Sequence, residues 1–195
     1  MKEKKDLLLV IDMQNVYLPG EEWACPSMAR TSGTIRRLLD TCWFQNVIFT
    51  KFTASEQPQG AWKSYNEINQ SVNENEWMND IVTELKPYLE RGMVCEKSVY
   101  SSMKIPEVVQ AAQRAEHIVL TGVVAECCVL ATMMEAIDFG CPVIYLTDAV
   151  SGQSDEKEAQ IASIAESFAP VHTIVETSER YIAEEEKTCS RREQK

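Results

Sequence analysis

Short apolar runs alternate with longer stretches of helical character along the chain. Six runs rich in β-branched and aliphatic residues are expected to form strands, and they cover residues 7–12, 47–51, 93–96, 117–121, 143–147 and 171–175. Helices are expected at 34–41, 76–89, 105–115, 128–139 and 155–168. Strands that alternate with helices and are apolar on both faces are typical of a parallel sheet covered on both sides. The sequence therefore predicts an α/β fold, a Rossmann-like three-layer α/β/α sandwich around a six-stranded, mostly parallel sheet.

Two stretches depart from this pattern. Residues 57–76 are polar and aromatic without a clear period, which predicts a long loop that acts as a lid or an interface. The polar residues from 183 onward are expected to form a solvated helix end that frays. Because no repeat or linker interrupts the pattern, we expect a single domain over residues 1–182 and a polar tail over 183–195.

Composition narrows the range of partners. Nineteen Lys and Arg residues against thirty Asp and Glu residues give a net charge of −11, and the basic residues are not clustered. Nucleic acids and anionic membranes both select for clustered positive charge, so neither is expected as a partner. The apolar run at 7–11 is too short for a signal peptide or a membrane span, which predicts a cytoplasmic protein.

The cysteine pattern favours reduced thiols. Seven cysteines form an odd set with no C-x-x-C spacing, which does not suit a disulfide framework, and they lie at positions 25, 42, 95, 127, 128, 141 and 189. A redox role for the adjacent Cys127 and Cys128 is disfavoured because a disulfide between neighbours is strained.

Three residues capable of chemistry lie at the expected ends of strands. Asp12 ends the first strand, Lys97 follows the third, and Cys128 begins the helix after the fourth. Ligands of open parallel sheets bind outside the carboxyl ends of the strands. A thiol at a helix N-terminus is expected to have a lowered pKa, which favours the nucleophilic thiolate. Each residue also has a structural explanation, as a turn former, a solvated lysine and a small core residue respectively.

Three motifs in the right order and spacing decide between these explanations. They are LLVIDMQN at 8–15, EKSVYSS at 96–102, and the stretch from Thr121-Gly122 to Cys128-Val129. Together they resemble the isochorismatase-like cysteine hydrolase superfamily, which includes nicotinamidases and N-carbamoylsarcosine amidohydrolases. The resemblance spans nearly the whole chain and implies a six-stranded parallel sheet between helices.

The resemblance also implies a catalytic triad of Asp12, Lys97 and Cys128. Asp12 would take the thiol proton, Lys97 would lower the thiol pKa and hold the aspartate, and Cys128 would attack a carbonyl carbon. The backbone N–H groups of Ala125 and Cys128 would form the oxyanion hole, with a cis peptide bond before Ala125. Family members usually have threonine at the position of Ala125, so this chain loses a hydroxyl there and keeps the backbone donor.

The chain departs from nicotinamidases in its lack of imidazole ligands. Those enzymes bind a metal through an Asp-x-His pattern after the second strand, where this chain reads Thr50-Lys51-Phe52-Thr53, and no histidine precedes His117. We therefore expect no metal and no cofactor, and nicotinamidase activity is disfavoured. His117 and His172 are expected to be structural.

The expected function is metal-independent hydrolysis of a C–N bond in a small amide, ureido or carbamoyl compound through a Cys128 thioester. Isochorismatase-type vinyl-ether hydrolysis is an alternative, although that branch often lacks the cysteine, and a noncatalytic member of the fold is a third possibility. The partners expected are a small-molecule substrate and further copies of the chain in a dimer or tetramer. The residues expected to line the substrate pocket are Phe52, Trp62, Tyr65, Tyr100 and Glu126.

Overall fold

The computed structural model describes residues 4–41 and 44–193, and the side chains of Lys4 and of 188–193 are outside that description. Its centre is a six-stranded sheet with the order β3-β2-β1-β4-β5-β6, in which every pair of neighbours is parallel. The strands are β1 Lys4–Ile11, β2 Phe44–Phe52, β3 Met93–Lys97, β4 Ile118–Val123, β5 Val143–Ser151 and β6 Thr173–Glu176. All six expected strands are confirmed, and the expected α/β fold with them.

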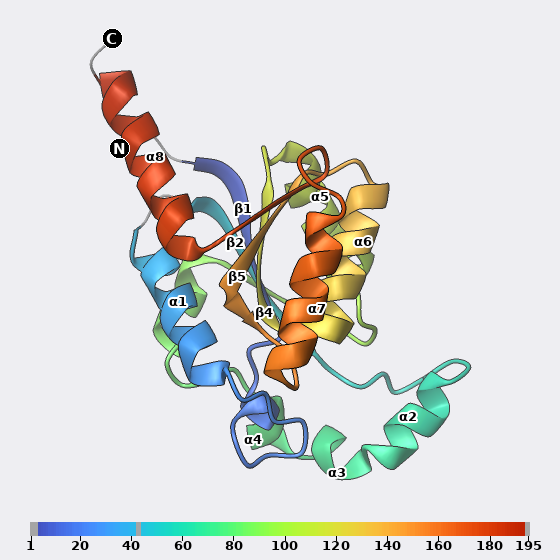
Figure 1. The fold of residues 1–195 in the computed structure, drawn as a ribbon. Coiled ribbons are helices and arrows are strands. Elements are labelled where there is room, and N and C mark those ends of the chain that lie inside the picture. The colour runs from blue at the N-terminus through green and yellow to red at the C-terminus, as the bar shows by residue number, and fades with distance from the viewer. Residues whose placement is uncertain (1–3, 42–43, 194–195) are drawn as a thin grey trace.

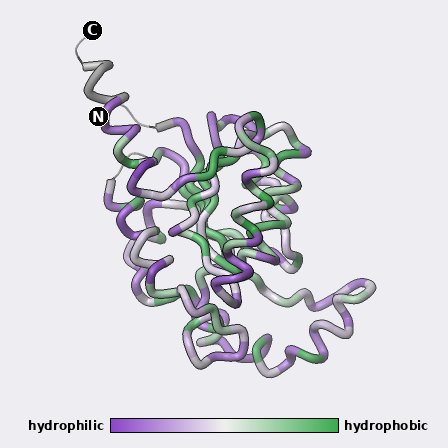
Figure 2. Tube along the Cα trace, viewed as in Figure 1, coloured by the Kyte–Doolittle hydropathy of each residue, from purple (hydrophilic) through white to green (hydrophobic). Residues whose placement is uncertain are grey.

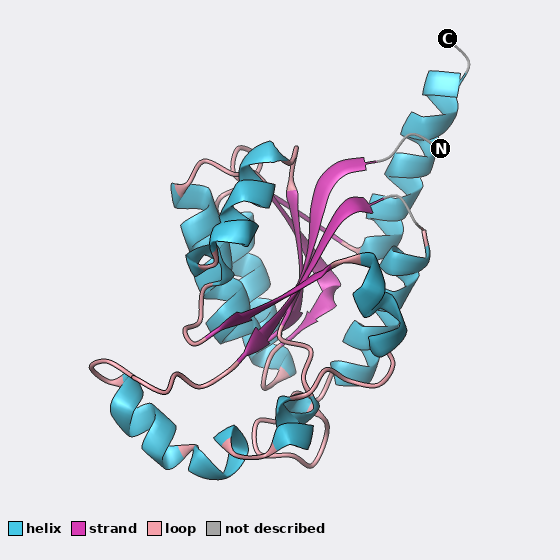
Figure 3. Cartoon of the chain, turned by 180° about the vertical axis from the view of Figure 1, so that it is seen from behind, coloured by secondary structure: helices cyan, strands magenta, loops and turns pink. Residues whose placement is uncertain are grey.

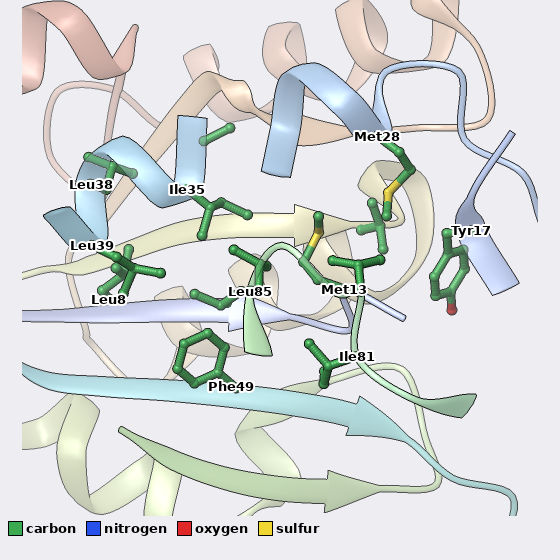
Figure 4. Packing of buried hydrophobic residues seen from close by; sticks show 14 of the residues in the cluster. Leu8, Met13, Tyr17, Met28, Ile35, Leu38, Leu39, Phe49, Ile81 and Leu85 are labelled. Carbon is green, nitrogen blue, oxygen red and sulfur yellow. The ribbon is translucent and has the colours of Figure 1, made fainter. Parts of the chain in front are cut away.

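Helices cover both faces of the sheet (Figures 1 and 3). One face carries α1 Met28–Asp40 and α8 Ser178–Glu193, and the other carries α5 Pro106–Arg114, α6 Leu130–Asp138 and α7 Asp155–Glu166. Side chains alternate along each strand, so Leu8 packs in the first layer and its neighbours Leu7 and Leu9 pack in the second. Figure 4 shows the first layer, in which Leu8 and the α1 residues Leu38 and Leu39 lie together.

The expected loop at 57–76 is wrong, because this segment contains the helices α2 Trp62–Ile68 and α3 Gln70–Asn73. Both views show it extending away from the sheet (Figures 1 and 3), and most of it is hydrophilic (Figure 2). No residue of α2 is buried, so this helix has no side chain packed into the core, and with seven residues it is too short to show a clear period. A hydrophobic period therefore gives no signal for it.

The single helix expected at 76–89 is also wrong. It is replaced by the one-turn helix α4 Glu76–Asn79 and the 3₁₀ helix η2 Lys86–Arg91. Between them Ile81 forms a β-bridge with Gln14, Val82 N donates to Met13 O at 2.9 Å, and residues 83–85 form a turn. Pro87 lacks an N–H, so it cannot continue an α-helix from residues before it, and it lies instead in the first turn of η2, where that N–H is not needed.

The remaining boundaries differ by less. Helix α1 begins at Met28, earlier than the expected residue 34, because the weak helix formers Thr31, Ser32 and Gly33 obscure its first turns in the sequence. Helix α8 extends through the expected tail to Glu193, and the final two residues lie outside the described ranges.

Five cysteines whose side chains are described are free, namely Cys25, Cys95, Cys127, Cys128 and Cys141. Cys42 and the Cys189 side chain fall outside the described residues. Within residues 4–41 and 44–193, no helix combines the length and the apolar character that crossing a membrane requires.

Candidate active site

The site lies where the direction of strand order reverses, between the adjacent strands β1 and β4. Asp12 follows β1 directly, and Lys97 is the last residue of β3. Cys128 lies in η4, a π-helical turn over Ala125–Val129 that follows β4 and leads into α6. The three predicted residues therefore meet outside the carboxyl ends of the strands, where ligands of such sheets bind.

Asp12 is fully buried and its carboxylate is held on both oxygens. Thr50 Oγ1 donates to Oδ1 at 2.6 Å, and Lys97 Nζ donates to Oδ2 at 2.5 Å. Its backbone has φ of 50°, a left-handed conformation that aspartate tolerates better than most residues, and its N–H donates to Thr50 O at 3.1 Å. These contacts fix the direction of the carboxylate.

Lys97 reaches across β2 from the edge strand β3. Its ammonium donates to Asp12 Oδ2, lies 3.4 Å from Cys128 Sγ, and donates to Val99 O at 3.2 Å. The ring centroid of Phe52 lies 5.7 Å from Nζ, a cation–π distance. Burial opposes the charge on Lys97, but Asp12 and Cys128 outweigh it, so the pKa of this lysine is raised. Lys97 is therefore an ammonium ion at neutral pH.

Cys128 has the reverse of the pKa shift expected from its place at a helix start. Burial of the thiol, which is 3% exposed, and the negative charge of Asp12 raise its pKa well above the ordinary value, although Lys97 lowers it. The resting site thus holds a neutral thiol beside an Asp12–Lys97 ion pair. Such a thiol needs a base before it can attack, and Asp12 is placed to act as one.

The turn that carries Cys128 begins earlier than expected. The cis peptide bond joins Val123 and Val124, so its expected position before Ala125 is wrong by one residue. Gly122 already departs from strand geometry with φ of 105°, and Val124 is extended directly before the π-helical turn begins at Ala125. Ala125 is fully buried, and its role and that of Cys128 N–H as oxyanion donors stay predictions.

Hydrogen bonds through Thr132 connect the Cys128 turn to Ser102. Thr132 Oγ1 donates to Cys128 O at 2.6 Å and accepts from Ser102 N at 2.9 Å. Gln14 holds the end of β2, since its side chain donates to Phe52 O at 3.0 Å and accepts from Phe52 N at 2.8 Å.

Four of the five expected pocket residues gather into one aromatic cluster. Trp62 lies 6.1 Å from Phe52, 5.2 Å from Tyr65 and 5.0 Å from Tyr100, measured between ring centroids. The cluster includes Trp23, 6.1 Å from Phe52, and Tyr17, 5.7 Å from Trp23. The aromatic cluster therefore consists of Tyr17, Trp23, Phe52, Trp62, Tyr65 and Tyr100.

Glu126, the fifth expected pocket residue, is engaged elsewhere. Its Oε1 accepts from Lys157 Nζ at 2.9 Å and from Gln153 N at 3.3 Å, which ties the turn to the start of α7. Its Oε2 is buried, and among the described residues it has no hydrogen-bond partner. A role for Glu126 in substrate binding stays a prediction.

Sequence reasoning missed Thr50, Tyr17 and Trp23. Thr50 carries a signal, since it is a polar residue at the end of the otherwise apolar run Val47-Ile48-Phe49. Tyr17 ends the three-residue 3₁₀ helix η1 Asn15–Tyr17 and Trp23 lies in a turn, and neither segment is long enough to show a period. For the part of the chain that is described, no group of three or more His, Cys, Asp or Glu side chains is arranged to hold a metal ion.

The fold resembles several solved structures at low sequence identity. A cysteine hydrolase from Pseudomonas syringae pv. phaseolicola 1448A is 19% identical with a TM-score of 0.77, covering 92% of this chain and 91% of that chain. N-carbamoylsarcosine amidase from Thermoplasma acidophilum is 22% identical with a TM-score of 0.68, covering 91% and 97% respectively. MAR1 ribonuclease from Caenorhabditis elegans is 22% identical with a TM-score of 0.70, covering 93% and 81%. These likenesses establish the fold alone.

A search of curated proteins finds no significant match. The family profile of the isochorismatase domain, however, matches residues 6–176. That range includes every strand end at the site, from Asp12 to the residues after β5. The chain therefore belongs to the isochorismatase family.

Proposed function

We propose that the protein is a cysteine hydrolase that needs no metal and cleaves a C–N bond of a small amide, ureido or carbamoyl compound. One observation carries the proposal: a single buried ammonium, Lys97 Nζ, contacts both Asp12 Oδ2 and Cys128 Sγ. A carboxylate, an ammonium and a thiol in mutual contact supply a base, a fixed positive charge and a nucleophile, which acyl transfer through a covalent intermediate requires.

The reaction begins with transfer of the Cys128 proton to Asp12 as Sγ attacks the carbonyl carbon. The C=O π electrons move to oxygen, and the resulting oxyanion accepts hydrogen bonds from the N–H groups of Ala125 and Cys128, each worth about 10²–10³ in rate. The C–N bond then breaks, and the nitrogen leaves with the proton from Asp12. Lys97 stays protonated throughout and stabilises whichever of the thiolate and the carboxylate is charged.

The second half-reaction hydrolyses the thioester and frees Cys128. Asp12, again a carboxylate, takes a proton from water as the hydroxide attacks the thioester carbon. The C–S bond breaks and Cys128 recovers its proton from Asp12, so the net reaction consumes one water and yields an acid and an amine or ammonia. The neutral resting thiol fits this cycle, because the base is used in both halves.

Cys128 favours amide chemistry over the alternatives. Vinyl-ether hydrolysis does not require a thiol, whereas here the thiol contacts the ion pair. The amidase named among the similar structures uses the same fold. The similar MAR1 ribonuclease raises RNA as a substrate, but a net charge of −11 disfavours a polyanion. The expected self-association remains part of this proposal.

The test is ammonia release from a panel of small amides, ureides and carbamoyl amino acids. Wild type and Cys128→Ala are compared with and without a chelator, and Cys127→Ala serves as the matched thiol control. We expect release that survives the chelator and Cys127→Ala but is lost in Cys128→Ala. Release that persists in Cys128→Ala, or turnover of RNA or a vinyl ether in place of every amide, contradicts the proposal.

A further inference from the structure

Cys128 lies in a turn that departs from α-helical hydrogen bonding. Val124 O accepts hydrogen bonds from Cys127 N at 3.0 Å and from Val129 N at 3.2 Å. The second bond spans five residues, whereas an α-helical bond spans four, so the turn holds one residue more than an α-helix would. Such turns are rare and occur mainly at functional sites. A contact that holds Cys128 in this conformation therefore bears on the reaction of its thiol.

Thr132, one turn further along in α6, makes such a contact. A hydroxyl can donate and accept at once, and both directions are fixed here. Because Ser102 N–H can only donate, Thr132 Oγ1 accepts from it at 2.9 Å, and its own proton goes to Cys128 O at 2.6 Å. Thr132 and Ser102 are fully buried, and Cys128 is nearly so. Water is therefore excluded from both bonds, which strengthens them and makes their loss costly.

The bond to Ser102 joins the Cys128 turn to the segment that follows Lys97. Lys97 ends β3, and its ammonium donates to Val99 O at 3.2 Å within that segment. The same ammonium lies 3.4 Å from Cys128 Sγ. Lys97 and Cys128 are thus connected twice, directly and through Thr132.

Other links between these two segments contribute less. Lys104, in the 3₁₀ helix η3 Ser102–Lys104, forms an ion pair with Glu135 of α6. The lysine side chain is 62% exposed, so water weakens this pair. The Ser102 hydroxyl has no hydrogen-bond partner among the described residues, so Ser102 takes part through its N–H. Of these links, the Thr132 hydroxyl is the one shielded from water.

We propose that Thr132 is a positioning residue, whose hydroxyl holds the Cys128 turn against the segment after Lys97 and keeps Sγ beside the buried ion pair. It acts on the thiol through the backbone, since its hydroxyl contacts Cys128 O rather than Sγ. The inference rests on the proposed function for its effect on turnover, whereas its effect on the thiol can be measured without a substrate.

Thr132→Val tests the proposal, because valine has the shape of threonine but neither donates nor accepts a hydrogen bond. A turn released from Ser102 lets the thiol move away from its buried place beside Asp12. Burial and Asp12 raise the thiol pKa more than Lys97 lowers it, so a displaced thiol has a lower pKa and is more reactive. We expect iodoacetamide to label Cys128 about three- to tenfold faster at neutral pH, the range that one net hydrogen bond accounts for. Peptide mass spectrometry follows the labelling.

Turnover should fall as labelling rises. A thiol displaced from its base is misaligned for attack, so we expect kcat for an amide to fall by about ten- to a hundredfold while KM changes little. Thr132→Ser keeps the hydroxyl and should restore both rates.

Thr173→Val is the matched control. Thr173 Oγ1 also makes a buried bond, to Ala165 O at 2.6 Å, but it lies at the start of β6, at the opposite end of the sheet from the site. We expect a loss of stability in urea comparable to that of Thr132→Val, with labelling and kcat unchanged. The comparison separates positioning of the thiol from general destabilisation.

Unchanged or slower labelling in Thr132→Val, an equal effect of Thr173→Val, or a serine variant as impaired as valine overturns the proposal. So does an unchanged kcat in Thr132→Val where the wild type turns over an amide. If Thr132→Val does not fold, Thr132→Ala takes its place with the same expectations. Faster labelling confined to Thr132→Val, without amide turnover by the wild type, would refute the proposed function while leaving the positioning role intact.

Discussion

The Asp12 carboxylate depends on two donors of different kinds. Lys97 supplies charge, and Thr50 supplies a neutral hydroxyl that directs Oδ1. Both donors and the acceptor are buried, so neither contact is weakened by water. The hydroxyl therefore positions the base rather than taking part in bond formation.

Thr50→Val should separate these two contributions. The substitution keeps the shape of the side chain and leaves one carboxylate oxygen without its donor, so we expect a loss of about 1–3 kcal/mol in the free energy of unfolding. We also expect kcat to fall, since the base becomes less well oriented. Urea unfolding and steady-state kinetics measure the two effects. Thr50→Ser retains the hydroxyl and should recover most of both, and a Ser variant as impaired as Val would contradict this role.

Asp12→Asn should make the thiol more reactive while it abolishes hydrolysis. Burial and the charge of Asp12 raise the Cys128 pKa and Lys97 lowers it, so removing the carboxylate charge leaves only burial to oppose Lys97 and lowers the pKa of the thiol. We expect faster alkylation of Cys128 at neutral pH, together with a loss of about 10²–10⁴ in kcat because the general base is gone. Iodoacetamide labelling as a function of pH, with Lys97→Met as the opposite case, measures this. Slower labelling in Asp12→Asn would show that the carboxylate does not raise the thiol pKa.

At the scale of elements, the spacing between β1 and β4 brings the base and the nucleophile together. Ile11 and Gly122 are partners in the register of these strands, directly before Asp12 and the Cys128 turn. A Cβ at Gly122 would lie 2.1 Å from Ile11 O, and φ there is 105°. Only glycine satisfies both the close approach and the conformation.

Gly122→Ala is expected to destabilise the protein by more than the strain alone. A positive φ costs a non-glycine residue about 1–3 kcal/mol, and relief of the backbone contact must also separate the strands. Gly140→Ala is the matched control, because Gly140 has φ of 75° and open space around its Cβ position, so about 1–2 kcal/mol is expected there. Thermal unfolding of both variants compares them. Equal losses would mean that the contact with Ile11 is unimportant.

For the whole molecule, the sequence predicted the elements that have a strong hydrophobic period. The prediction was wrong for segments whose structure depends on contacts with residues distant in the sequence. All six strands follow from apolar runs, and Asp12, Lys97 and Cys128 converge because parallel strands end at one edge. Ile81 and Val82 fit a helical period in sequence, yet they are buried where they bond to Gln14 and Met13, in the segment that follows β1. The pKa of Cys128 is raised by burial and by the charge of Asp12. Burial arises from the packed fold and Asp12 is distant in the sequence, so the residues around Cys128 do not reveal the shift.

The buried thiols predict a protein that loses stability in alkali. Burial raises the pKa of Cys25 from 9.0 to about 12, with further contributions from Glu126 and Glu158. Between these values the unfolded state has lost a proton that the folded state keeps, so the free energy of unfolding falls as pH rises and levels off above the folded pKa. Each such thiol contributes a slope of about 1.4 kcal/mol per pH unit.

Urea unfolding at a series of alkaline pH values measures this slope. Cys25→Ala should reduce the slope by the contribution of one thiol, whatever its effect on stability at neutral pH. A slope that is unchanged in Cys25→Ala would place the titrating groups elsewhere.

Lys97 also has a mechanical consequence for the sheet. Strand β3 lies at an open edge, where Met93 and Val94 are 49% and 43% exposed, and such edges are templates for pairing with other chains. The Lys97–Asp12 ion pair crosses β2 and anchors the end of this edge strand to the centre of the sheet. Without this ion pair the end of β3 should separate from β2 more easily and expose the sheet edge. A Lys97 variant is therefore expected to aggregate as well as to lose activity.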